Sequence, residues 1–232
     1  MDAYLFDLDG TLVDSIGDIA ECANLVRDSF GLAPLPETRI YTFIGEGSRH
    51  LVARALAGTI DGPTPDDATL DEAVRRWVAL YETHMMKRTR LFPGIDAALR
   101  QLQGLKAIVT NKPGDSARQL CRRARLDDFC PVIIGMGDVP ERKPARDGID
   151  AALARLEAIS GGQKIERAVF VGDSPIDGGA AKSAGLPFVG VLWGLGTRAE
   201  LESADAIAIA ERVEDLVGCC ARALLASKPI KR

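Results

Sequence analysis

Short apolar runs alternate with helical patterns along most of the chain. A strand buried on both faces shows a continuous apolar run, whereas an amphipathic helix repeats its apolar residues every three or four positions. Their alternation predicts an α/β fold with a mostly parallel sheet, helices on both faces and right-handed connections. The expected strands are residues 3–6, 106–109, 132–134, 168–171, 188–192 and 206–210, and the expected crossover helices are 116–125, 147–158 and 177–184.

Residues 16–90 break this alternation. Their apolar residues recur at helical spacing without a strand signal, and loops at 33–36 and 61–65 separate the pieces. We therefore expect a helical domain, residues 16–90, inserted into a core formed by residues 1–15 and 91–232. The apolar stripe of residues 70–81 serves either the inserted domain's own core or a homodimer interface, so monomer and homodimer both stay open.

Composition narrows the class of protein. The 232 residues are 47% hydrophobic and 27% charged, as in an ordinary globular protein. The net charge of −4 does not favour nucleic acid, and no apolar run approaches the roughly 20 residues of a membrane span. The N-terminus lacks a basic stretch followed by an apolar one, and the five cysteines lack metal-ligand spacing. We expect a cytoplasmic protein with reduced thiols and with neither nucleic acid nor membrane as partner. Residues 228–232 are expected to be a frayed end.

Polar residues follow three of the expected strands. The segments are Asp7-Leu8-Asp9-Gly10-Thr11, Thr110-Asn111-Lys112 and Gly172-Asp173-Ser174-Pro175-Ile176-Asp177. Parallel strands present their carboxyl ends at one edge of the sheet, so these segments are expected to meet there. One carboxylate can attack phosphorus, a second can move a proton, others can hold a divalent cation, and hydroxyl and amide groups can bind phosphoryl oxygens. A single Asp-x-Asp-x-Thr segment could be a solvated turn, but three such strand ends predict phosphoryl-transfer chemistry.

Together with Lys143-Pro144, these segments resemble the four ordered motifs of the haloacid dehalogenase superfamily of phosphatases. The phosphoglycolate phosphatase branch is most similar, since Phe43-Ile44-Gly45-Glu46-Gly47, Phe92-Pro93-Gly94 and the 177–185 segment also match it. The resemblance implies a Rossmann-like core with a helical cap inserted after the first strand. It also implies a Mg²⁺-dependent phosphomonoester hydrolase that works through an aspartyl-phosphate on a small phosphorylated metabolite.

The resemblance also assigns roles to residues. Asp7 resembles the nucleophile, and Asp9 resembles the general acid that protonates the leaving alcohol and then activates water. Thr110 and the Asn111 amide resemble the groups that hold phosphate oxygens, while Lys143 offsets charge between phosphate and Asp7. A Lys-Pro pair in a loop is usually solvent-facing, so only the order of the motifs selects Lys143.

The metal site follows from the same resemblance. Asp7, Asp173 and the backbone carbonyl of Asp9 match the protein's share of the Mg²⁺ ligands, and Asp177 matches a residue that supports the site without binding the ion.

Several interpretations stay open at the level of sequence. Arg49 either meets a substrate carboxylate or belongs to a helix start that Ser48 caps. Lys112 is either a phosphate contact or a solvated loop lysine. Phosphoglycolate is the leading substrate, and the alternatives are pyrophosphate, a sugar phosphate or a nucleotide, or mutase action on a phosphosugar. A phosphate-binding module without catalysis is the competing class of function. The loop 194–196 departs from an aromatic-bearing loop often seen in this branch, which weakens the assignment of any one substrate.

Overall fold

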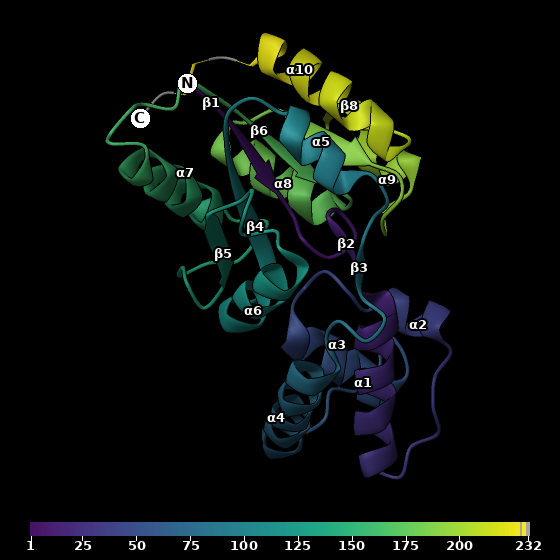
Figure 1. Ribbon diagram of the computed structural model, residues 1–232. Helices are drawn as coiled ribbons and strands as arrows, with labels where there is room; N and C mark the ends of the chain where they lie inside the picture. Colours follow the sequence, from purple (N-terminus) through teal and green to yellow (C-terminus); the bar gives the residue numbers. More distant parts are fainter. Residues whose placement is uncertain (228, 231–232) are drawn as a thin grey trace. The chain divides into compact units, whose positions relative to one another are not determined.

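A six-stranded sheet forms the centre of the first of two compact units into which the chain divides (Figure 1). This core comprises Met1–Asp14 and Leu91–Arg232, and the second unit comprises Ser15–Arg90. The computed structural model describes residues 1–227 and 229–230. The expectation of a frayed end therefore falls partly outside the described residues. Within them, the Ile230 amide donates a hydrogen bond to the Glu166 carbonyl (2.9 Å), so that residue is tied to the core rather than frayed.

All pairings in the six-stranded sheet are parallel, and the strand order is β5-β4-β1-β6-β7-β8. The strands are β1 (Asp2–Phe6), β4 (Leu105–Pro113), β5 (Val132–Met136), β6 (Arg167–Gly172), β7 (Phe188–Val191) and β8 (Ala206–Ala210). Helices cover both faces of the sheet. Side chains that point to either face are therefore buried along most strands, and these strands appear in the sequence as unbroken apolar runs. The predicted α/β architecture with a parallel sheet is confirmed.

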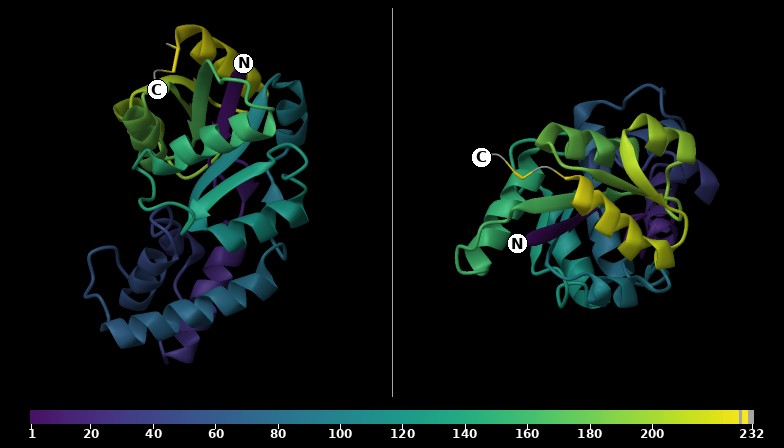
Figure 2. Two further views of the ribbon diagram at one scale, coloured as in Figure 1. Left: turned by 90° about the vertical axis from the view of Figure 1, so that its left-hand side faces the viewer. Right: turned by 90° about the horizontal axis from the view of Figure 1, so that it is seen from above.

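Helices α7 (Asp147–Ile159), α8 (Pro175–Ala184) and α9 (Arg198–Ser203) pack on one face of the sheet, in a cluster that includes Leu5, Val109 and Phe170. The other face is covered by α5 (Ile95–Gln101), α6 (Gly114–Ala124) and α10 (Leu216–Ala226), with a short 3-10 helix at Val213–Asp215 (Figure 2). The crossovers between parallel strands therefore run on both sides of the sheet. They leave its carboxyl edge to the loops.

The second unit contains α1 (Ile16–Ser29), α2 (Glu37–Tyr41), α3 (Ser48–Ala57) and α4 (Asp67–His84). Helix α4 contacts α1 and α3, and its Trp77 and Tyr81 rings stack with centroids 4.9 Å apart and are buried. The apolar stripe of α4 is thus used inside its own unit. The short strands β2 (Val13–Asp14) and β3 (Arg90–Leu91) pair where the chain passes between the units.

Four helices lie outside those expected from the sequence. Helices α2, α5 and α9 have only 5, 7 and 6 residues, which is too few to display a helical period. Helix α10 has the sequence LVGCCARALLA, in which apolar and small residues fill nearly every position and blur the period. Among the described residues, no helix is long and apolar enough to cross a membrane.

Candidate active site

The carboxyl edge of the sheet brings the three polar segments together. Asp7 follows β1 directly, Asp173 follows β6 directly, and Thr110 lies near the end of β4. Asp177 is in the first turn of α8. The convergence results from the parallel topology, because β1 is hydrogen-bonded to β4 on one side and to β6 on the other.

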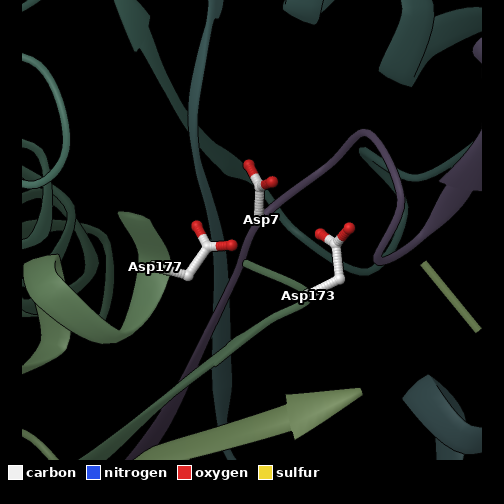
Figure 3. A group of neighbouring side chains, drawn as sticks. All are labelled: Asp7, Asp173 and Asp177. Atoms are coloured by element: carbon white, nitrogen blue, oxygen red, sulfur yellow. The ribbon is translucent and has the colours of Figure 1, made fainter. Parts of the chain in front are cut away.

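Three carboxylates form the centre of the site. Asp7, Asp173 and Asp177 each offer an oxygen, and these oxygens lie within 4.8 Å of one another. Figure 3 shows the three side chains gathered around one space, from the β1 end, the β6 end and α8. Among the described residues, no donor makes a hydrogen bond to the buried Asp7 Oδ1. Three neighbouring carboxylates, one of them with an oxygen that accepts no hydrogen bond, are a donor set that suits a hard divalent cation.

Backbone and hydroxyl groups fix the Asp173 carboxylate. The Thr11 hydroxyl donates to Oδ1 (2.9 Å), and the Leu195 amide donates to Oδ2 (2.6 Å). Glycines make room for it: a Cβ at Gly10, whose φ is +88°, would stand 2.3 Å from Asp173 Oδ2, and one at Gly194 would stand 2.4 Å from the same atom. The 194–196 loop thus serves to hold an acid of the cluster.

Lys143 lies between two of the acids. Its Nζ is 2.7 Å from Asp177 Oδ1, to which it donates, and 2.6 Å from Asp7 Oδ1, at an angle that falls short of hydrogen-bond geometry. The residue is only 4% exposed, and its ammonium stands over the Phe170 ring. The usual solvent-facing position of a loop lysine is therefore the wrong description of Lys143.

Burial and charge set the ionisation of this cluster. Burial raises the pKa of Asp7 to about 6, with Asp177 and Asp9 adding to the rise and Lys143 opposing it. Burial, then Asp177 and Asp7, raise the pKa of Asp173 well above its usual value. Burial would lower the pKa of Lys143, but Asp177 and Asp7 outweigh it and raise the pKa above its usual value. The lysine is thus held as an ammonium, and the crowded acids favour a cation among them.

Asp177 is fully engaged by its neighbours. Its Oδ2 accepts hydrogen bonds from the Ser174 amide (3.0 Å) and the Ser174 hydroxyl (2.6 Å), while Oδ1 accepts from Lys143. Ser174 is the N-cap of α8 and Asp177 its third residue, which together form a capping box. The helix start thereby aims one Asp177 oxygen at Lys143.

Thr110 and Asn111 have different partners. The Thr110 hydroxyl accepts from the Lys112 amide (3.1 Å), so its proton is available for another acceptor. The Asn111 side chain donates to the Lys143 carbonyl and accepts from the Lys143 amide, both at 3.0 Å. The Asn111 carboxamide therefore fixes the Lys143 backbone.

Lys112 is the contact that sequence reasoning missed. Its Nζ lies 3.0 Å from both carboxylate oxygens of Asp9, and its side chain is only 3% exposed. The solvated lysine considered from sequence is thus excluded. Local sequence offered no signal for this pair, because the two residues are 103 positions apart and β4 loses its regular register between Val109 and Pro113.

Arg49 lies in the second unit. Its guanidinium bonds to Asp71 and, at 3.0 Å, to Asp67, and 44% of its side chain is exposed. Both acids belong to α4, and Arg49 itself is the second residue of α3, where Gly47 rather than Ser48 is the N-cap. The structure thus gives Arg49 a role in joining α3 to α4.

Comparison with known proteins finds relatives that cover most of the chain. The sequence profile of haloacid dehalogenase-like hydrolases matches residues 4–191. A phosphoglycolate phosphatase of Rhodobacter capsulatus is 37% identical over 190 residues, covering 81% of this chain and 82% of the relative. A phosphoglycolate phosphatase of Pseudomonas putida is 33% identical over 221 residues, covering 94% and 79%.

Solved structures agree with these relatives. A Lactobacillus delbrueckii protein with the provisional designation phosphoglycolate phosphatase superposes with a TM-score of 0.81 at 25% identity, over 94% of this chain and 97% of its own. A haloacid dehalogenase-like family protein of Streptococcus pneumoniae gives 0.76 at 26% identity, over 93% and 96%. With sequence and fold matched over most of its length, this chain belongs to the family of haloacid dehalogenase-like hydrolases.

Proposed function

We propose that this protein is a Mg²⁺-dependent phosphomonoester hydrolase that works through an aspartyl-phosphate on Asp7, with phosphoglycolate as its substrate. The observation that carries the chemistry is the buried Asp7 carboxylate, which has one oxygen without a hydrogen bond and an ammonium 2.6 Å away. The observation that carries the substrate is the name phosphoglycolate phosphatase of relatives up to 37% identical.

In the first step, the Asp7 carboxylate attacks phosphorus and the bond from phosphorus to the leaving oxygen breaks. Asp9 donates a proton to that oxygen, so that an alcohol departs. The Thr110 hydroxyl and the Asn111 backbone amide hold phosphoryl oxygens. The Lys143 ammonium reduces the repulsion between the carboxylate and the anionic substrate.

In the second step, a water molecule attacks the phosphorus of the aspartyl-phosphate. The Asp9 carboxylate accepts a proton from this water, and the bond from phosphorus to Asp7 breaks. Inorganic phosphate leaves and both acids return to their starting states. The same residue thus serves as acid in one step and as base in the next.

The fit of the acid cluster supports a magnesium ion as the cofactor. The Asp7 and Asp173 carboxylates and the Asp9 carbonyl would hold it, while Asp177 supports the site through Lys143. Bound there, Mg²⁺ supplies a positive charge that orients the phosphoryl group and neutralises part of its charge.

Substrate selection is assigned to the inserted helical cap, residues 16–90, with Arg49 as the candidate partner of a substrate carboxylate. Because Asp67 and Asp71 already bind Arg49, it would have to exchange one of them for the substrate. Arg49→Ala should then raise KM for phosphoglycolate more than for a phosphomonoester without a carboxylate. An equal rise for both substrates would remove Arg49 from recognition.

A cytoplasmic location completes the proposal, with a small phosphorylated metabolite as partner and neither nucleic acid nor membrane. All five cysteines are free thiols and buried, which is the usual state in a reducing compartment. Whether the chain works as a monomer or as a homodimer is tested by its mass in solution.

The experiment is a panel of phosphorylated metabolites scored by released phosphate, with Mg²⁺ and with EDTA. The highest kcat/KM is expected for phosphoglycolate, and EDTA should abolish turnover. A higher kcat/KM for pyrophosphate, a sugar phosphate or a nucleotide would make that compound the substrate and leave the assignment to the family unchanged. Conversion of a phosphosugar without phosphate release would indicate a mutase. Binding without any turnover across the panel would indicate a phosphate-binding module.

A further inference from the structure

Lys112 and Asp9 form a largely buried ion pair at the site, and the proposed chemistry gives Lys112 no role. The ammonium stands 3.0 Å from both oxygens of the carboxylate, so it contacts the two of them equally. The Lys112 side chain is 3% exposed and that of Asp9 is 14% exposed, so water screens the pair far less than it would a surface ion pair. Such a contact restrains the rotation of a short carboxylate side chain.

Lys112 is itself attached to well-fixed structure. It lies in β4, its amide donates to the Thr110 hydroxyl at 3.1 Å, and the preceding Asn111 is joined to the Lys143 backbone. The main chain beneath Lys112 is therefore held by the same contacts that position the phosphate-binding groups. The Lys112 ammonium therefore holds the Asp9 carboxylate at a fixed position relative to Thr110.

We propose that Lys112 is a positioning residue that orients the Asp9 carboxyl group for proton transfer to the leaving oxygen. The proposal rests on the proposed function, because it takes Asp9 as the general acid. The direct phosphate contact considered from sequence is the alternative, and the experiments below distinguish it from action through Asp9. A general acid is effective only when its oxygen lies within hydrogen-bond reach of the atom that it protonates.

The test uses the leaving group, because a poor leaving group needs a proton and a good one does not. The value of kcat/KM reports the steps up to phosphoryl transfer to Asp7 and is measured for phosphoglycolate and for p-nitrophenyl phosphate. Lys112→Met should lower kcat/KM for phosphoglycolate by about 10-fold or more. The loss should not exceed the roughly 10²- to 10⁴-fold that general acid catalysis supplies in total. For p-nitrophenyl phosphate, kcat/KM should fall by less than about 3-fold. Equal losses for both substrates would overturn the proposal.

Two further variants identify the route of the effect. Lys112→Arg keeps the charge and should restore part of the phosphoglycolate activity, although a planar guanidinium does not reproduce a compact ammonium. In an Asp9→Asn background, Lys112→Met should cause no further loss with phosphoglycolate. A full additional loss in that background would show that Lys112 acts directly on the phosphate, and would overturn the positioning role.

A matched control comes from the same strand. Lys106 also lies in β4, with its ammonium bonded to the Gly104 carbonyl, and Lys106→Met should leave both kcat/KM values at the parental level. The failures of the two proposals are distinguishable. If Asp9→Asn itself leaves phosphoglycolate turnover unchanged, the assignment of the acid is wrong. If Asp9→Asn lowers phosphoglycolate turnover but Lys112→Met does not, only the role of Lys112 is wrong, provided that circular dichroism shows the Lys112→Met protein to be folded.

Discussion

The side chain of Asn111 and the backbone of Lys143 exchange two hydrogen bonds of 3.0 Å, although 32 residues separate them in sequence. The pair joins the end of β4 to the loop that precedes α7. It fixes the backbone from which the Lys143 ammonium reaches Asp7 and Asp177. The proposed catalytic lysine, which lies in a loop, is thus placed by an asparagine near the end of β4.

Asn111→Ala should therefore lower activity without touching a reacting atom. Loss of the carboxamide leaves the Lys143 amide and carbonyl unpaired in a buried site, at a cost of about 1–3 kcal/mol in unfolding free energy. The displaced ammonium should lower kcat/KM by about 10-fold or more. Kinetics and urea unfolding measure the two effects. Parental kcat/KM in a folded Asn111→Ala protein would contradict the positioning of Lys143 by Asn111.

Lys143→Met should affect both stability and catalysis. It leaves Asp7 and Asp177 buried without their shared cation, and breaking a buried ion pair in this way costs about 3–5 kcal/mol. The value of kcat/KM should fall by roughly 10²-fold or more, since the ammonium acts where the transition state gains charge. Lys143→Arg should recover more of the stability than of the activity. A Lys143→Met protein with unchanged kcat/KM would remove the lysine from the mechanism.

Thr11 gives a test of the cation site through a residue that does not bind the ion. Its hydroxyl donates to Asp173 Oδ1 at 2.9 Å, and Thr11→Val removes that donor with little change in shape. Loss of a residue that hydrogen-bonds to a metal ligand typically lowers the affinity for the metal by about 10- to 100-fold. The Mg²⁺ concentration for half-maximal activity should rise by that factor. Thr11→Ser keeps the hydroxyl and should stay near the parent, and the same shift in both variants would argue against the hydroxyl.

The second unit has its own buried acid. The fully buried Asp18 accepts hydrogen bonds from the Arg88 amide (2.8 Å), the Thr89 amide (2.9 Å) and the Thr89 hydroxyl (2.6 Å). Burial alone would raise its pKa, but the Thr89 hydroxyl, the Thr89 amide and the other backbone donors outweigh it and lower the pKa below 3.8. Its carboxylate thereby ties the start of α1 to the segment that precedes β3.

Because the pKa of Asp18 is lower in the folded protein, its stabilisation is fully present above the unfolded pKa and is lost as the pH falls through the folded value. Asp18→Asn should lower the unfolding free energy by about 1–3 kcal/mol at pH 7, and the difference from the parent should shrink below about pH 4. The unfolding free energy of this unit is measured by urea unfolding followed by Trp77 fluorescence, in a protein in which Trp193 is replaced by Phe. A difference that is constant from pH 7 to pH 3 would contradict the account.

Sequence predicted the framework of the fold and of the site better than the contacts within the site. Apolar runs identified the strands of the six-stranded sheet because its two covered faces bury nearly all residues of the central strands. Parallel topology then predicted that Asp7 and Asp173 would meet. The pairing of Lys112 with Asp9 joins positions 103 residues apart, and the burial of Lys143 depends on Asp177 of α8. Local patterns carry no signal for such pairs. The helices α2, α5 and α9 are missed for another reason, since they are too short to display a helical period.

The central claim, a phosphoryl group carried by Asp7, is tested most directly by trapping the intermediate. Rapid acid quenching during turnover, followed by borohydride, reduces an aspartyl-phosphate to homoserine, and peptide mass spectrometry locates it. We predict homoserine at position 7 in the parent, in greater yield in Asp9→Asn if the second step is slowed more than the first, and none in Asp7→Asn. Homoserine at another position, or none at position 7 during active turnover of parent and Asp9→Asn, would contradict the account.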